Sequence, residues 1–396
     1  MTRSLLTSLC HCGLVAFVAF SGSCVQSGAS DRGSAGGAGS HIATSPANTI
    51  TDASLTGDAV TMAKAMGFGV NIGNTLESTN IWETGWGQPL ITQTYINGLA
   101  NHGIRTVRVP VAWDTYAVNG VIAPEKMARV HQVVQWIIDA DMYAIVNIHW
   151  DNGWIHNEHA DASIQYQLTD DVRAKFASYW AQISTAFADV GDHLVLEAMN
   201  EERFVTQVNG VNTPDYAALN ELNQTFVNTV REGGGANESR ALLIAGYNTS
   251  IESTCVDAFK VSNDPAGTGK LFLSIHYYDP YTFCQLATPD DKSKLQPVTT
   301  WGTAAEQAAQ RSSFNRLTAF SLARNIPVIL GEFAVTLGSG QYVRESASRI
   351  LWMASVASAS FAGNMVPVLW DTGTDVNRID GSLSPDFQAA MTQLGQ

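Results

Sequence analysis

Short apolar runs alternate with longer amphipathic segments from about residue 55 onward. The runs are rich in Val, Ile and Leu without strict alternation with polar residues, which is typical of strands buried on both faces of a parallel sheet. This pattern predicts eight strands, at Phe68–Gly73, Thr106–Val111, Tyr143–His149, Leu194–Asn200, Ala241–Tyr247, Leu271–Tyr277, Pro327–Phe333 and Met365–Asp371.

The segments between the runs carry apolar residues at helical spacing. In the segment after Pro124, for example, Val130, Val133 and Ile137 fall on one stripe behind a proline near the start. Helices are predicted at Pro124–Ala140, Asp170–Val190, Pro214–Glu232, Trp301–Arg324 and Gln341–Ala359. The stretch Asn248–Lys270 is too rich in Gly and Pro for a helix prediction.

This regular alternation of strands and helices predicts an α/β fold. The first choice is a (β/α)8 TIM barrel that forms a single catalytic domain over residues 51–396. An open, doubly wound sheet with helices on both faces is the alternative, and the pattern alone leaves it open.

The start of the chain has the composition of a targeting segment. Arg3 is followed by a short apolar stretch, Leu14–Phe20, and then by small residues up to Cys24. Residues 1–24 therefore predict a secretory signal peptide, which is too short to span a membrane. The protein is expected to be exported from a bacterial cell.

The residues around Cys24 suggest how the exported protein could be retained. Ser21-Gly22-Ser23-Cys24 resembles a bacterial lipobox, in which the cysteine is lipidated, although Ser21 stands where a Leu-like residue is usual. Residues 25–50 are mostly Gly, Ser, Ala and small polar types and predict a flexible tether. A secreted protein and a membrane-tethered lipoprotein both remain open.

Overall charge narrows the classes of partner. The chain has 36 acidic and 22 basic residues, a formal net charge of -14. This argues against nucleic acid or an anionic membrane surface as a partner, because both need a cationic face. Ten Trp and eleven Tyr residues suit a neutral sugar ligand, since aromatic faces stack against sugar rings. We expect a monomer.

Two cysteines, Cys255 and Cys284, remain in the folded part of the chain. In an exported protein such a pair predicts one disulfide. Two unrelated buried thiols are the alternative.

Two glutamates stand at the ends of predicted strands: Glu201 directly after Leu194–Asn200, and Glu332 near the end of Pro327–Phe333. In a parallel barrel the carboxyl ends of the strands form the active site. Two carboxylates are what glycosidic-bond hydrolysis requires. Other candidates at or next to strand ends are Asn74, Arg108, His149, Trp150, Asn200, His276, Tyr278 and Trp370.

Residue chemistry suggests a role for each of these groups. Glu201 would be the general acid/base, which requires a raised pKa. Glu332 would be an ionised carboxylate beside Arg108, and Tyr278 could donate to it. Trp370 would form the floor under the reacting sugar. No cofactor is expected and no metal, because the spacing of histidines after His149 matches no zinc pattern.

Several short motifs, in order, resemble glycoside hydrolase family 5, and most closely its bacterial endo-β-1,4-glucanases. They are Asn71–Glu77, Glu83–Gly87, Arg108–Pro110, Asn147–His149, Asn200-Glu201, His276–Tyr278 and Gly331–Phe333. The resemblance implies a retaining double displacement with Glu201 as acid/base and Glu332 as nucleophile, their carboxyl groups about 5 Å apart. It also implies supporting roles for Arg108, His149, Asn200, His276, Tyr278 and Trp370.

The resemblance further implies an endo-acting enzyme on cellulose-like or mixed-linkage β-glucans. Mannan, xyloglucan and β-1,3-glucan remain alternative substrates, and a non-catalytic surface glycan-binding lipoprotein is an alternative of another class. Two departures from the family pattern stand out. Glu202-Arg203 follow Glu201 where Pro is usual, and Trp150 follows His149 where a polar residue is common. Trp150, Asp151 and Trp154 are therefore expected to shape the cleft.

Overall fold

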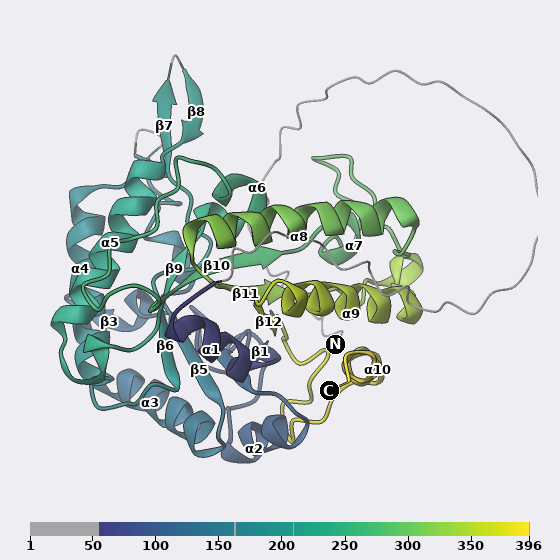
Figure 1. Ribbon diagram of the computed structural model, residues 1–396, viewed down its shortest axis with the longest axis horizontal. Helices are drawn as coiled ribbons and strands as arrows, with labels where there is room; N and C mark the ends of the chain where they lie inside the picture. The colour runs from purple at the N-terminus through teal and green to yellow at the C-terminus, as the bar shows by residue number, and fades with distance from the viewer. Residues whose placement is uncertain (1–54, 162–163, 209, 396) are drawn as a thin grey trace, which may run out of the picture.

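Eight parallel strands close into a barrel in the computed structural model, which describes residues 55–161, 164–208 and 210–395 (Figure 1). Around the barrel the strands follow the order β1, β12, β11, β10, β9, β6, β5, β2. Their bounds are β1 (Gly69–Asn71), β2 (Thr106–Val109), β5 (Tyr143–Asn147), β6 (Leu194–Glu197), β9 (Leu242–Ala245), β10 (Leu271–Tyr277), β11 (Val328–Phe333) and β12 (Val366–Leu369). The predicted barrel is confirmed. The doubly wound alternative is wrong, because β1 pairs with both β2 and β12.

Helices surround the barrel and follow the predicted order. They are α1 (Asp58–Met66), α2 (Gln93–Asn101), α3 (Pro124–Asp139), α4 (Asp170–Ala186), α5 (Tyr216–Glu232), α6 (Ile251–Thr254), α7 (Tyr281–Cys284), α8 (Ala304–Arg324), α9 (Ser346–Ala362) and α10 (Pro385–Gln393). The five predicted helices are confirmed as α3, α4, α5, α8 and α9. Helix α8 begins later than predicted because Thr303 and Glu306 form a capping box at its start.

Two antiparallel hairpins were not predicted. They are β3 (Ala117–Val118) with β4 (Val121–Ile122), and β7 (Val205–Val208) with β8 (Val211–Pro214). The second projects from the body of the protein shortly after Glu201 (Figure 1). Both hairpins are short and largely exposed, so they lack the apolar runs that revealed the barrel strands.

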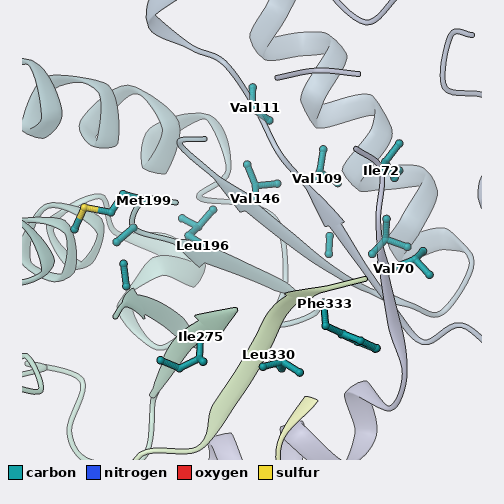
Figure 2. Packing of buried hydrophobic residues seen from close by; sticks show 14 of the residues in the cluster. Val70, Ile72, Val109, Val111, Val146, Leu196, Met199, Ile275, Leu330 and Phe333 are labelled. Carbon is teal, nitrogen blue, oxygen red and sulfur yellow. The ribbon is translucent and has the colours of Figure 1, made fainter. Parts of the chain in front are cut away.

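Barrel side chains divide between two cores. Val109, Val146, Leu196, Ile275 and Leu330 belong to the larger cluster, which includes the apolar faces of the surrounding helices (Figure 2). A smaller cluster fills the barrel interior with Ile145, Val195, Leu243, Phe272, Ile329, Val366 and Val368. Helix α1 adds Ala59, Ala63 and Met66 to this interior cluster and so covers one mouth of the barrel.

The predicted disulfide is wrong. Cys255 and Cys284 are both free thiols, the first half-buried and the second buried. Cys255 follows α6 beside Glu252 and Arg316, whereas Cys284 ends α7 near Asp279. The prediction failed because counting two cysteines says nothing about how close the fold brings them.

The predicted signal peptide (residues 1–24), lipidation site Cys24 and tether (25–50) lie outside the described residues. Among the residues that the structure does describe, none of the helices combines the length and apolar character needed to cross a bilayer.

Candidate active site

Polar side chains replace apolar ones along the inner face of the barrel toward the carboxyl ends of the strands. On β10, Phe272 belongs to the interior core, and Ser274 and His276 follow at the spacing of two that keeps side chains on one face. On β6, Glu197 likewise follows Val195 of the interior core at a spacing of two. On β5, Asn147 follows Ile145 in the same way. The result is a buried polar layer above an apolar one.

Glu332 reaches this layer through an irregularity in β11. Ile329 belongs to the interior core, so regular alternation would turn Glu332 to the outside. The register between β10 and β11 shifts, however, pairing Ile275 with Leu330 but His276 with Glu332. Gly331 is the extra residue, and this bulge turns Glu332 toward the interior.

Gly331 also has a steric role. A Cβ at this position would lie 3.2 Å from His276 Nε2 and 3.3 Å from Ser274 Oγ. Both neighbours are buried members of the polar layer, so the glycine lets the β11 backbone approach them closely.

Arg108 lies at the centre of the site and is fully buried. Its Nη1 donates to Glu332 Oε1 at 2.7 Å and to Asn71 Oδ1 at 2.9 Å. Its Nη2 donates to Asn200 Oδ1 at 2.9 Å. Nε and Nη2 also donate to the two oxygens of Glu197, at 2.6 and 3.2 Å. All three guanidinium nitrogens are thus paired, which fixes the plane of Arg108.

The two candidate catalytic carboxylates converge on His276. Its Nδ1 lies 2.7 Å from Glu201 Oε1 and 3.6 Å from Glu332 Oε2. One oxygen of each carboxylate and a His276 nitrogen lie within 4.8 Å of one another. Glu332 also accepts a 2.9 Å hydrogen bond from the Tyr278 hydroxyl. The side chain of Glu332 is 7% exposed and that of Glu201 is 43% exposed, so only Glu201 faces solvent broadly.

The electrostatics of the pair differ from the expectation of a raised pKa at Glu201. Partial burial raises the pKa of Glu201, but the hydrogen bond and charge of His276, with the charge of Arg108, lower it further than burial raises it. Burial and the negative charge of Glu201 raise the pKa of Glu332. Together they outweigh the charges of His276 and Arg108, which lower it. The two carboxyls therefore titrate as one interacting pair, and the raised pKa that a general acid needs is not found at Glu201 in the substrate-free site.

His149 and Trp370 form one wall. Their rings are stacked, with centroids 5.6 Å apart and planes 4° from parallel. Burial and the positive charges of Arg108 and His276 hold the pKa of His149 well below its ordinary value, so the ring is neutral at pH 7. Asn200 is buried, and because its Oδ1 accepts from Arg108, its amide N–H groups are the donors it can offer a ligand.

Trp150 belongs to a second polar group beside the first. Its Nε1 donates to Glu158 Oε2 at 2.7 Å. The same carboxylate lies 3.5 Å from His156 Nε2, and His156 Nδ1 is hydrogen-bonded to Glu202. Asp151 is buried and accepts from the backbone amides of Trp113 and Thr115 rather than facing a ligand.

The structure thus brings together Glu201, Glu332, Arg108, Asn200, His276 and Tyr278, with His149 and Trp370 stacked and Trp150 in the neighbouring group. The backbone N–H of Asn74 donates to Glu77, and the role of its side chain stays a prediction. Glu197 and Ser274 were missed in the sequence, and Asn71 was recognised only as the start of the Asn71–Glu77 motif, without a role in the site. The signal that could have found them is spacing. Each is a polar residue on the inward face of a predicted strand, as Ser274 is two positions before His276.

Glu201, His276 and Glu332 are close enough to hold a cation. Arg108 already supplies a positive charge to Glu332, so the expectation of a metal-free site stays as it was. A closed (β/α)8 barrel with two carboxylates at its carboxyl rim is the arrangement of an enzyme that cuts glycosidic bonds.

Comparison with known proteins identifies the family. Residues 64–375 match the family model described as Cellulase (glycosyl hydrolase family 5), and the chain belongs to that family. It is 30% identical over 338 residues to Endoglucanase A of Paenibacillus barcinonensis, across 78% of this chain and 81% of the relative. It is accordingly a glycoside hydrolase of the endoglucanase type.

Solved structures agree with this placement. A GH5-4 broad specificity endoglucanase from an uncultured bovine rumen ciliate superposes with a TM-score of 0.74 at 31% identity, over 86% of this chain and 99% of that chain. A Bacteroides ovatus GH5 xyloglucanase in complex with a XXXG heptasaccharide superposes with a TM-score of 0.75 at 27% identity, over 87% and 80% of the two chains.

Proposed function

We propose that the protein is an exported, endo-acting retaining glucanase that cleaves β-1,4-glucosidic bonds in cellulose-like or mixed-linkage β-glucans. The observation that carries the mechanism is the carboxylate separation. Oxygens of Glu201 and Glu332 lie within 4.8 Å of each other. Retaining enzymes have their carboxyl groups about 5 Å apart, whereas inverting enzymes leave roughly 6.5–9.5 Å for a water molecule.

In this mechanism Glu332 is the nucleophile and Glu201 the acid/base. The Glu332 carboxylate attacks the anomeric carbon while Glu201 gives its proton to the leaving glycosidic oxygen, forming a covalent glycosyl-enzyme. Glu201 then takes a proton from water, which attacks the anomeric carbon and releases Glu332. Arg108 and Tyr278 stabilise the ionised Glu332 through their hydrogen bonds.

Glu201 must hold a proton for the first step, so its pKa must rise when substrate binds. Glu201 is 43% exposed in the empty site, so a bound sugar can displace the water that stabilises its ionised form. Removing that water raises the pKa of a carboxyl group. Glu332 is already buried and keeps its Arg108 and Tyr278 contacts, so substrate binding should raise the pKa of Glu201 more than that of Glu332.

The names of the similar proteins indicate a class of substrate. They include endoglucanases and a xyloglucan-specific endo-β-1,4-glucanase of Bacteroides ovatus. A β-1,4-linked glucan backbone is common to cellulose, mixed-linkage glucan and xyloglucan, so we infer that this backbone is what the cleft accepts. Mannan and β-1,3-glucan are the alternative substrates.

The test is release of reducing ends by purified residues 50–396 from carboxymethylcellulose, lichenan, xyloglucan and mannan. Glu332→Ala should abolish turnover and leave glucan binding intact, because the nucleophile is lost while the side chain, at 7% exposure, offers little surface to a bound polymer. Retained activity in that variant would refute the nucleophile assignment. Failure of the wild type on every polymer would revive the non-catalytic glycan-binding protein.

We further propose that the chain is exported through residues 1–24 and lipidated at Cys24. Support comes from the signal-like composition and from the Gly/Ser-rich tether that follows. Expression of the full chain in a bacterium with labelled palmitate should give a labelled membrane-bound protein, and Cys24→Ser should abolish the label. Unlabelled protein in the medium would instead indicate simple secretion.

A further inference from the structure

The residue after Glu201 makes a contact outside the catalytic group. Glu202 is buried, with 2% of its side chain exposed, and it is hydrogen-bonded to Nδ1 of His156. His156, 7% exposed, comes from the segment between β5 and α4, and its Nε2 lies 3.5 Å from Glu158 Oε2. One imidazole therefore lies between two carboxylates from different segments.

This contact continues to the aromatic side chain at the end of β5. Glu158 Oε2 also accepts from Trp150 Nε1 at 2.7 Å. A chain of polar contacts thus runs from Glu202, next to the acid/base candidate, through His156 and Glu158 to Trp150. We call these four residues the Glu202–Trp150 chain.

Two further hydrogen bonds join the same two segments, and both are made to Tyr166. Val205 N donates to the Tyr166 carbonyl at 2.8 Å, and Tyr166 N in turn donates to the carbonyl of His156, within its own segment, at 2.7 Å. Arg203 Nη2 donates to the Tyr166 hydroxyl at 3.0 Å. The segment that follows Glu201 is therefore attached at residues 202, 203 and 205 to the segment that follows Trp150.

The charge state of His156 follows from its surroundings. A neutral imidazole has one N–H and can donate to one carboxylate, whereas an imidazolium donates to both. Burial lowers the pKa of His156, but Glu202 and Glu158 more than compensate and raise it to about 9. The other groups nearby are the Tyr166 ring, 5.1 Å from the imidazole, Arg203 beside Tyr166, and His159 near Glu158. Among these groups the two carboxylates dominate.

We propose that His156 is a positioning residue of the active site, which as an imidazolium fastens the segment carrying Trp150 to the segment carrying Glu201. The inference rests on the proposed function of Glu201. Because Glu202 is covalently next to Glu201, movement of Glu202 moves the acid/base. Because Glu158 holds the Trp150 indole, the same imidazolium also orients an aromatic side chain next to His149.

The first experiment compares His156→Gln and Glu202→Gln with wild type on lichenan, with His131→Gln as the matched control. His131 is a histidine of α3 stacked on Phe187, away from both segments. His156→Gln and Glu202→Gln should each lose about 10-fold or more in kcat/KM, since small displacements of a catalytic group have large effects on rate. His131→Gln should retain wild-type kinetics. Unchanged activity in both His156→Gln and Glu202→Gln would overturn the proposal.

A pH series separates positioning from a general loss of stability. In Glu202→Gln one carboxylate is gone, so the His156 pKa should fall from about 9 toward its ordinary 6.5. Between pH 6 and 9 the variant then loses its imidazolium while wild type keeps it. The ratio of wild-type to variant kcat/KM should rise across this range, and a ratio independent of pH would contradict the proposal.

One readout keeps the outcome independent of the proposed activity. NMR titration of labelled histidine rings, with the His156 signal assigned by its absence in His156→Gln, should give a pKa near 9 in wild type and a lower one in Glu202→Gln. A wild-type pKa near 6.5 would overturn the proposal. If His156→Gln does not fold, Glu158→Ala serves as the second variant. Wild type inactive on all glucans would refute the function, whereas active wild type with indifferent variants would refute only this inference.

Discussion

Arg108 and Glu197 form a fully buried ion pair, in which Arg108 Nε donates to Glu197 Oε2 over 2.6 Å. The opposite side of the same guanidinium holds Glu332 at 2.7 Å. Glu197 thus sets the orientation of the cation that contacts the nucleophile candidate, although it lies in the barrel wall below it. Its second oxygen is also occupied, by Arg108 Nη2 and by the Ser274 hydroxyl.

We therefore expect Glu197→Gln to impair both stability and catalysis. Donors face both oxygens of Glu197, so an amide nitrogen at either place would face another donor. Removing one charge of a buried pair costs about 3–5 kcal/mol, and the retained amide oxygen should hold the loss near the lower end. The free energy of unfolding in urea and kcat on lichenan should both fall.

The control for this variant is Glu221→Gln. Glu221 pairs with Arg173 at 2.5 Å, but both side chains are well exposed, at 45% and 39%. Exposed pairs contribute about 1 kcal/mol or less, so neither unfolding nor kcat should change much. Equal effects of the two substitutions would show that burial of the Arg108 pair is not what matters.

The pH profile should report the electrostatic coupling of the two catalytic carboxyls. Glu332 must be ionised to attack, so kcat/KM should fall as the pH drops through its pKa, which lies above the ordinary 4.5. The negative charge of Glu201 contributes to that elevation. Glu201→Gln should therefore move the acid limb to lower pH.

This shift is measured with a dinitrophenyl β-cellobioside, whose leaving group departs without protonation. That substrate lets Glu332 be followed when Glu201 is absent. An acid limb at the same pH in both proteins would mean that Glu201 does not influence Glu332.

The bulge residue Gly331 should tolerate no side chain without loss of activity. A Cβ would lie 3.2 Å from His276 Nε2, so the imidazole must shift by a few tenths of an ångström. We expect Gly331→Ala to lower kcat by roughly 10- to 100-fold through displaced catalytic contacts. Stability should fall by only about 1 kcal/mol, as for an average substitution.

Gly191→Ala is the matched control, because a Cβ there meets no atom within 4 Å. Its kcat should equal that of wild type. Wild-type kcat in Gly331→Ala would mean that His276 has more room than the structure indicates.

Glu77 should make stability depend on pH. Burial raises the pKa of its carboxyl to about 7, despite hydrogen bonds from the backbone amides of Thr75 and Asn74. Because the folded-state pKa exceeds the unfolded value of 4.5, the folded protein binds more protons between these pH values. Stability therefore falls as the pH rises from 4.5 to 7, by about 3 kcal/mol in all.

Urea unfolding of residues 50–396 at pH 5 and pH 8 measures this effect. In Glu77→Gln the difference between the two pH values should be smaller than in wild type by about 2.5 kcal/mol, since pH 5 already lies above the unfolded pKa. An unchanged difference would assign the pH dependence to other groups.

Thiol chemistry should reflect two separate cysteines. Residues 50–396, denatured without reductant, should titrate with two thiols per chain, from Cys255 and Cys284. In the native protein both should react slowly, because burial raises the pKa of each thiol. A denatured protein with no reactive thiol would restore the disulfide.

The barrel and much of the site could be predicted because they depend on local patterns. All residues of β10 were predicted as a strand, and the contacts of Arg108 and Tyr278 with Glu332 were anticipated from charge and hydrogen-bonding chemistry. The end of β6 was placed too late: the strand stops at Glu197, so Glu201 lies on the following loop. Because the strand was predicted to run on to Asn200, Glu197 was placed inside the strand and not among the strand-end candidates.

Other features depend on where distant segments meet. The register shift at Gly331 arises between β10 and β11, and the direction of the Glu201 pKa arises from His276, 75 residues away. The Glu202–Trp150 chain joins segments 46 residues apart at His156 and Glu202. Sequence patterns marked Glu202 as unusual but gave no partner for it.

The position of α1 has a consequence for how the enzyme would be presented to a polymer. This helix covers the mouth of the barrel opposite the carboxyl rim, so the described chain begins on the back of the catalytic body. A lipid attached further upstream would then hold the body from behind. The carboxyl rim would then lie on the side of the catalytic body opposite the point where the chain enters it, so a polymer could reach the site without meeting the attachment.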